Sequence, residues 1–166
     1  MFRHVIMPLV LLGLTGASAT AQEMTFSSRT LTTEAALAAT QAALQSCRDS
    51  GYQVAVAVTD RMGNPISILR DRYAGAHTAE TATRKAYTAA SFRMDTTSLA
   101  LETAAGEAAS GIRQVPQILA LGGGLPIESA GALVGAIGVS GAPGAQADDG
   151  CAQAGIDAIQ DDLDFE

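Results

Sequence analysis

The sequence predicts a single domain of the α/β (α+β) sandwich type, in which helices pack on an antiparallel sheet in the order αββααβββα. Residues 51–70 alternate in hydrophobicity around a central turn, as a β-hairpin does. Residues 115–143 contain further short apolar segments separated by glycine-rich turns. Alanine-rich segments with helical periodicity precede, separate and follow these two regions. Because no linker or internal repeat interrupts the chain, we expect all elements to share one core.

The first expected element is a helix that runs from Thr32 to Ser50. Thr32 is a favourable N-cap, and Glu34 lies in the first turn, where the helix dipole favours a negative charge. Gly51 follows the last helical residue and is expected to end the helix in the left-handed conformation. The helix is therefore bounded at both ends by residues of the expected type.

A hairpin is expected next. Valines 54, 56 and 58 alternate with alanines, which predicts a strand with one bulky and one small face. Asp60 and Gly63 occupy the first and last positions of a turn, and Pro65 leads into a second strand at Ile66–Arg70. Pro65 is tolerated because its missing N–H lies at the margin of the sheet.

The second half is expected to begin with two helices. Thr78 is predicted to cap a helix that runs to about Phe92, and Asp95 or Thr97 to begin another that ends near Gly111. Three strands and a terminal helix complete the expected order: Gln117–Leu121, Leu125–Glu128 and Ala132–Ser140, then a helix near Asp148–Asp162.

The last expected strand has one face of small side chains. Val134, Ala136 and Gly138 are expected to share one face, and Leu133, Gly135, Ile137 and Val139 the other. The small face is expected to let a helix approach the sheet closely.

Residues 1–21 are predicted to be an export signal. Arg3 and His4 form a short basic start, and the apolar run Val5–Leu14 is too short to span a bilayer. We favour cleavage after Ala21, which leaves a single domain at 22–166; a retained membrane anchor is the alternative. The protein is therefore expected to be periplasmic if the host has two membranes, with no membrane association after cleavage.

The charge distribution disfavours nucleic acid as a partner. The chain carries a net charge of −7, which becomes −8 when Arg3 is removed, and the C-terminal end is strongly acidic. Residues 70–93 form a local basic cluster made of Arg70, Arg72, Arg84, Lys85 and Arg93. Nucleic-acid binding needs a more extended basic surface. The cluster fits a small anionic ligand or an acidic patch on a neighbouring subunit.

Two cysteines, Cys47 and Cys151, are expected to form a disulfide in an oxidising compartment. The bond would join the first helix to the last. The alternative is a pair of free buried thiols.

Several familiar motifs are incomplete. Gly122–Gly124 lacks the Lys-Ser/Thr of a phosphate loop, so a hairpin turn is the better interpretation. The glycines near Ser140 follow neither the dinucleotide-binding nor the nucleophile-elbow pattern. Zinc is disfavoured because the cysteines are far apart and His77 is the only histidine beyond residue 21.

His77 begins a polar stripe on the expected helix 78–92. His77, Thr81, Arg84 and Thr88 recur at helical spacing, with Lys85 at the edge of the stripe. The opposite stripe is expected to face the sheet and consists of Ala79, Ala82, Ala86 and Ala90.

The polar stripe is therefore expected to point outward. It can supply a neutral imidazole to a metal centre and two cations to ligand carboxylates. The alternative is a solvated face with a helix-capping histidine. Tyr73 and Tyr87 can also ligate or stack on a ligand, although packed tyrosines are the alternative.

Four stretches carry a resemblance that covers nearly all of the domain. They are residues 55–60 with Gly63, residues 84–92, residues 122–127 and residues 133–141. In this order and spacing, the chain resembles the GlcG/HbpS-like haem-binding family. The resemblance implies a five-stranded antiparallel sheet of profilin-like type and self-assembly into oligomers. It also implies haem binding, although some members of the family lie beside glycolate or diol metabolism with no settled activity.

The resulting prediction is an exported homo-oligomer that binds, sequesters or senses haem. His77 is the candidate axial ligand of the iron, and Thr81, Arg84 and Lys85 are the other candidate cofactor-binding residues, the two cations for the propionates.

Two alternatives stay open. The first is a non-haem accessory module that binds a small organic acid or docks on an exported dehydrogenase. The second is an enzyme acting on a small carboxylate with Asp60 or Asp71 as base. No catalytic residue is assigned.

Overall fold

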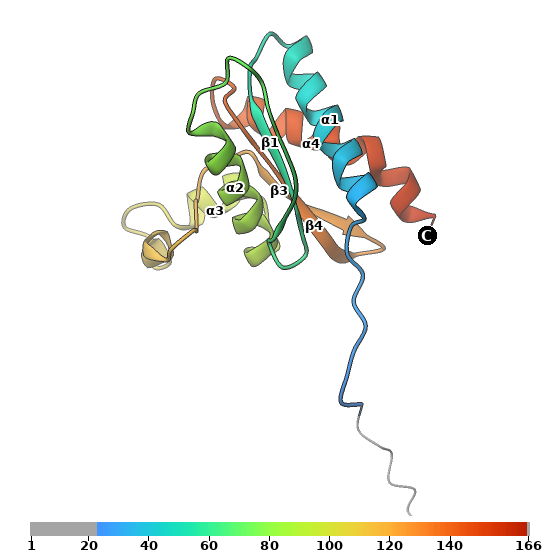
Figure 1. Ribbon diagram of the computed structural model, residues 1–166. Helices are drawn as coiled ribbons and strands as arrows, with labels where there is room; N and C mark the ends of the chain where they lie inside the picture. The colour runs from blue at the N-terminus through green and yellow to red at the C-terminus, as the bar shows by residue number, and fades with distance from the viewer. Residues whose placement is uncertain (1–22, 166) are drawn as a thin grey trace, which may run out of the picture.

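The computed structural model describes residues 23–165, so the predicted export signal lies outside the described residues. Within them, four α-helices, one 3-10 helix and four strands form a three-layered α+β domain (Figure 1). The helices are α1 (Thr33–Asp49), α2 (Thr78–Phe92), α3 (Thr96–Glu102) and α4 (Ala145–Asp164), with the 3-10 helix η1 (Ser110–Gln114). The strands are β1 (Ala55–Asp60), β2 (Pro65–Arg70), β3 (Gly124–Ser129) and β4 (Ala132–Ser140).

The strands form one antiparallel sheet in the order β2-β1-β4-β3. β1 and β4 are central, and nearly all of their residues are buried. Helices α1 and α4 cover one face of the sheet, and α2 and α3 lie on the other side (Figure 1). Both faces are covered, so the central strands are apolar on each side.

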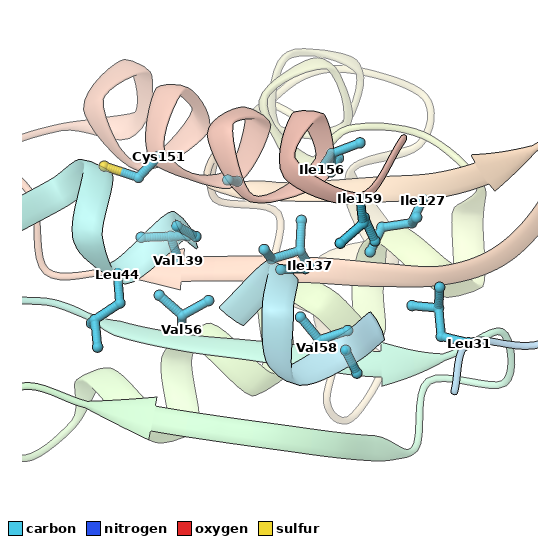
Figure 2. Packing of buried hydrophobic residues seen from close by; sticks show 14 of the residues in the cluster. Leu31, Leu44, Val56, Val58, Ile127, Ile137, Val139, Cys151, Ile156 and Ile159 are labelled. Carbon is cyan, nitrogen blue, oxygen red and sulfur yellow. The ribbon is translucent and has the colours of Figure 1, made fainter. Parts of the chain in front are cut away.

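The larger core lies between the sheet and helices α1 and α4. Figure 2 shows the aliphatic side chains of β1, β3 and β4 meeting those of the two helices. The labelled members of this cluster are Leu31, Leu44, Val56, Val58, Ile127, Ile137, Val139, Cys151, Ile156 and Ile159. Burial of each large aliphatic side chain stabilises the fold by about 1.5–3 kcal/mol.

The face of the sheet toward α2 is lined by small residues, as expected. Ala55 and Ala57 pack against Ala82 of α2. At Gly138 of β4, a Cβ atom would lie 2.1 Å from the Ala82 carbonyl oxygen. The glycine therefore lets the backbone of α2 rest on the sheet.

One residue was assigned to the wrong face of β4. Val134 packs in the α1–α4 core, because the register with β3 shifts so that Ile127 pairs with Gly135 but Glu128 pairs with Leu133. This irregularity leaves Val134 out of the ladder and breaks the simple alternation of faces.

The expected fifth strand at Gln117–Leu121 is wrong: among the described residues the sheet has four strands. Side chains of α2 bind this segment's backbone in place of a neighbouring strand. The Leu119 amide donates to Thr88 Oγ1 at 2.9 Å, and Arg84 Nη2 donates to the Ile118 carbonyl at 3.1 Å.

The third expected helix begins after Asp95 as predicted, because its carboxylate accepts from the Ser98 amide at 2.7 Å. It ends at Glu102 rather than near Gly111. The side chain of Arg113 lies against the C-terminal end of α3 and donates to the Thr103 and Ala100 carbonyls, each at 2.7 Å. These bonds satisfy carbonyls that a longer helix would have used.

Two other helix starts also differ from expectation. The N-cap of α2 is His77, and Thr78 is already helical, with its hydroxyl donating to the Gly75 carbonyl at 2.8 Å. α4 begins at Ala145, before the expected Asp148, because Gly144 at φ 101° turns the chain into the helix.

The ends of α1 and the first hairpin are confirmed. Thr32 Oγ1 accepts from the Ala35 amide at 3.1 Å, and Gly51 follows the helix at φ 82°. The turn between β1 and β2 is closed by the Gly63 amide, which donates to the Asp60 carbonyl at 3.0 Å.

A disulfide joins Cys47 of α1 to Cys151 of α4, across 104 residues of sequence, as expected. It fixes two helices of the same layer to each other. Among the described residues, no helix has the length and apolar character needed to cross a bilayer.

The close approach of α2 predicts opposite outcomes for two glycines. Gly138→Ala should lower the free energy of unfolding by about 2–3 kcal/mol, since its Cβ would overlap the α2 backbone. Gly150→Ala, on the exposed surface of α4 with open space around it, should be neutral or stabilising by up to about 1 kcal/mol. Urea unfolding of both variants measures the two free energies of unfolding. Equal changes in the two variants would contradict the close contact of α2 with Gly138.

Loss of the disulfide should destabilise the domain through the unfolded state. For a closed loop of this length, the chain-entropy model gives about 4–5 kcal/mol as an upper figure. The Cys47→Ala/Cys151→Ala double variant should show a decrease of up to this size in urea unfolding. Thiol titration of unfolded, unreduced protein should find no reactive thiol, and two reactive thiols would refute the bond.

Candidate functional site

A pocket of about 380 Å³ opens at the N-terminal end of α2. Three parts of the fold meet there: the start of α2, the glycine segment that leads into β3, and the connection from β4 to α4. The side chains that matter for its chemistry are His77, Thr78, Lys85, Ser140 and Asp148.

His77 lies at the mouth of this pocket and is exposed. It is the N-cap of α2, but its side chain makes no capping hydrogen bond. The ring lies against Gly75, where a Cβ atom would be 2.7 Å from His77 Cε1. Among the described residues the imidazole has no hydrogen-bond partner, so both ring nitrogens can serve a ligand.

Lys85, the only lysine of the chain, forms the buried side of the pocket with Asp148. Its side chain is 2% exposed, and Nζ donates to Asp148 Oδ2 at 2.7 Å and to the Val139 carbonyl at 2.8 Å. Asp148 Oδ1 accepts from the Ala142 amide at 3.0 Å. The ion pair is thus supported by hydrogen bonds, which a buried pair requires.

Burial raises the pKa of Asp148 above its ordinary value, although the Lys85 ammonium and the Ala142 amide act in the opposite direction. The sign for stability follows from linkage. A raised pKa means that the folded state holds the carboxyl proton of Asp148 more tightly than the unfolded state does. The contribution of Asp148 to the free energy of unfolding therefore falls as pH rises from about 4 through the raised pKa.

The segment Gly122–Gly124 makes room for this pair. A Cβ at Gly123 would lie 2.7 Å from both Lys85 Nζ and Asp148 Cβ, and Gly123 has φ 108°. Asp149 binds the same segment through the Gly123 amide, at 2.6 Å. The expected hairpin turn at these glycines is wrong, because the strand that it would have joined to β3 is absent from the described sheet.

The polar stripe of α2 does not point outward as a whole. Lys85 and Thr88 are buried, and Thr81 and Arg84 are partly buried. Thr81 Oγ1 donates to the His77 carbonyl at 2.9 Å, within the helix. The segment 117–121 covers this side of α2, which explains the error for Thr88.

Arg84 lies on the other flank of α2 from the His77 pocket. Its guanidinium donates to the carbonyls of Gln117 and Ile118 at 3.3 and 3.1 Å. Arg84 and Tyr87 line a separate pocket of about 620 Å³ beside the β1–β2 hairpin. The structure therefore brings His77 and Lys85 into one pocket and places Arg84 in another.

The two tyrosines that were candidate ligands differ in environment. Tyr73 is 81% exposed in the loop before α2. The ring of Tyr87 is packed on the hairpin turn, where a Cβ at Gly63 would lie 2.7 Å from Tyr87 Cδ2. Tyr87 thus has the packed environment that was the alternative interpretation.

The two candidate bases have structural partners. Burial acts to raise the pKa of Asp60, but hydrogen bonds from Asn64, Met62 and Gly63 outweigh it and hold the pKa below the ordinary value. Asp71 Oδ1 accepts from Arg48 Nε and Nη2 at 2.9 and 2.5 Å.

Asp148 and Gly75 are site residues that sequence reasoning missed. Asp148 lies in the strongly acidic C-terminal part of the sequence, yet it is only 4% exposed. The available signal was the single lysine on an alanine-rich helix, because a buried lysine requires a carboxylate partner.

Lys85→Met should destabilise the protein by about 3–5 kcal/mol at pH 7, because Asp148 keeps a buried charge without its cation. The loss should shrink near pH 4, where the carboxyl takes up a proton. Urea unfolding at the two pH values measures both effects.

The control is the Lys85→Met/Asp148→Asn double variant, which removes both charges and should regain most of the stability at pH 7. A pH-independent loss, or no recovery in the double variant, would contradict the coupling. In the unaltered protein, an amine-reactive label should not modify the buried Lys85 ammonium until the chain unfolds.

Comparison with known proteins gives a consistent result. A family model described as "Haem degrading protein HbpS-like" matches residues 31–157. A double mutant of HbpS from Streptomyces reticuli is 39% identical; the alignment covers 86% of this chain and 94% of that chain, with a TM-score of 0.77. No match was found among curated protein sequences.

Two more distant structures share the same α+β fold. The protein ORFY of Klebsiella pneumoniae, from the DUF336 family, is 26% identical, with 84% and 97% of the two chains covered and a TM-score of 0.81. A structure described as a PduOC:heme complex is 26% identical, with 78% and 95% covered and a TM-score of 0.73.

Proposed function

This chain belongs to the HbpS-like family, and on that basis we propose that it is an exported haem-binding protein with His77 as the axial ligand of the iron. The observation that carries the proposal is the exposed imidazole of His77, which has no partner among the described residues and stands at the mouth of a pocket. The similarity to a protein whose structure is described as a haem complex supports the choice of ligand.

Of the predicted haem-binding side chains, His77 is available to a ligand, whereas Lys85 and Arg84 are already bonded within the protein. Imidazole is a common axial ligand of haem iron. The two cations proposed for the propionates already have partners, since Lys85 is paired with Asp148 and Arg84 binds two carbonyls. Propionate binding by Lys85 and Arg84 therefore stays a prediction, and it requires each cation to give up its present partner. The predicted role of Thr81 in binding the cofactor also stays a prediction.

His77 is well placed to act as a ligand without a change in the fold. The residue is exposed at the start of the helix, and the absence of a side chain at Gly75 lets the ring lie against the loop. The ion pair of Lys85 and Asp148 holds α2 and α4 on the two sides of the pocket. Bound haem would supply an iron centre capable of electron exchange or ligand binding.

The pocket at His77 is small for a large flat ligand, so the proposal includes a site completed by a second copy of the chain. Its volume of about 380 Å³ is near the lower end for small-molecule sites, which is roughly 300 Å³. Homo-oligomerisation would supply the missing wall. The disulfide is compatible with the oxidising compartment that export to the periplasm provides.

The same small volume favours a second candidate function, that of a non-haem module binding a small organic acid. Lys85 provides a cation at the base of the pocket, and a volume of about 380 Å³ suits a short carboxylate better than a macrocycle. Thermal stabilisation by short hydroxy acids, without any response to haem, would favour this module over the haem protein.

Haemin titration of the purified protein should give a saturable shift of the Soret band. His77→Ala should weaken binding at least tenfold and change the band position, because the axial ligand is lost. Spectrophotometric titration of the two proteins measures this.

Tyr73→Phe tests the other candidate ligand in this loop: its exposed phenol is lost, and with His77 as the axial ligand the spectrum should stay unaltered. Binding that is unaffected by His77→Ala would exclude His77 as the ligand. The absence of saturable binding would exclude the function.

A further inference from the structure

A third cavity, of about 530 Å³, lies at the opposite end of the sheet from His77. It is formed where the β1–β2 turn, the end of α2 and the β3–β4 turn meet the N-terminal arm. Its charged lining residues are Arg29, Arg61, Arg93 and Glu128. None of them belongs to the pocket at His77.

The concentration of positive charge is unusual for this chain. Three arginines and one glutamate give the lining a formal charge of +2, whereas the whole chain carries −7. Arg29 already takes part in another interaction. The site considered below therefore uses only the guanidinium groups of Arg61 and Arg93. These two come from separate turns, 32 positions apart in the sequence, and are brought together by the fold.

Arg61 has an unmet hydrogen-bonding group. Its Nε is buried and lacks a hydrogen-bond partner among the described residues. A buried donor without an acceptor costs about 1–3 kcal/mol. An oxyanion seated against the guanidinium would provide that acceptor.

Arg93 has a backbone conformation that arginine rarely adopts. It follows the last residue of α2 at φ 55°, where glycine is the usual residue. The left-handed conformation costs a residue with a Cβ atom roughly 1–2 kcal/mol. An arginine at this strained position places a guanidinium group in the lining of the cavity, which a glycine could not do.

We propose that this cavity binds a doubly charged oxyanion of the phosphate type, held by the guanidinium groups of Arg61 and Arg93. Each planar guanidinium can donate two parallel hydrogen bonds to such an ion, and the charges of the two guanidinium groups balance a dianion. Glu128 opposes the anion and limits its affinity. The site is independent of haem and of His77.

The ion can be free or part of a larger molecule, and two probes distinguish these sources. Inorganic phosphate is titrated against the protein at constant ionic strength in chloride, with the arginine Nε–H signals followed by NMR. Vesicles containing phosphatidic acid are tested by co-sedimentation under the same conditions.

In the phosphate titration, the Arg61 Nε–H signal should shift saturably, while chloride alone should leave it unchanged. Arg93→Gly should raise the phosphate Kd about tenfold, which corresponds to loss of one charged interaction. This variant should fold, because glycine adopts the left-handed conformation readily. Glu128→Gln should lower the Kd, because it removes the opposing charge.

Arg72→Ala is the matched control. It removes one exposed arginine beyond the far end of β2, and it should leave phosphate binding unchanged. If only vesicles bind, and Arg93→Gly abolishes this, the oxyanion is a lipid headgroup. The proposal would be overturned if neither phosphate nor the vesicles bound. It would also be overturned if the Arg93→Gly variant bound them as well as the unaltered protein does.

Discussion

The contact between α2 and β4 at Gly138 sets the position of the features that give this domain its chemistry. Because the glycine has no side chain, the α2 backbone rests directly on the sheet. Lys85, one turn further along the helix, then binds the Val139 carbonyl near the end of β4 and Asp148 of α4. The resulting ion pair joins α2 to α4, and these helices lie on opposite faces of the sheet (Figure 1).

This arrangement divides the molecule into two chemically different ends. At the start of α2, an exposed imidazole stands beside a pocket whose base holds a satisfied ion pair. At the other end, two turns and the end of α2 bring arginines together in a cavity. The rigid central strands keep the ends apart, so a ligand at one end need not compete with a ligand at the other.

Much of the fold could be predicted because local chemistry and global packing agree. Thr32, Gly51 and Asp95 occupy the helix ends that their side chains or backbone freedom favour. The alternating valines of β1 are buried in the α1–α4 core. The disulfide followed from an even cysteine count in a chain with an export-like start, and the structure contains it.

The errors at the segment 117–121 and at Thr88 have one common cause, which is that contacts between distant segments overrode local patterns. The segment 117–121 has the composition of a strand, but Thr88 and Arg84 bind its backbone. Thr88 matched an outward stripe by spacing, yet this same segment covers it. An apolar run shows that a segment is buried, but only the tertiary structure shows what buries it.

The sequence by itself determined both ends of α1, the start of α3, the turn of the first hairpin, the cysteine pair and the prominence of His77. Only the tertiary structure decided that Lys85 turns inward to Asp148, that Arg84 lies outside the His77 pocket, and that Arg61 and Arg93 line one cavity. Caps, turns and alternation depend on neighbours within a few residues. Charge partners 63 positions apart depend on how the layers pack, which no local pattern encodes.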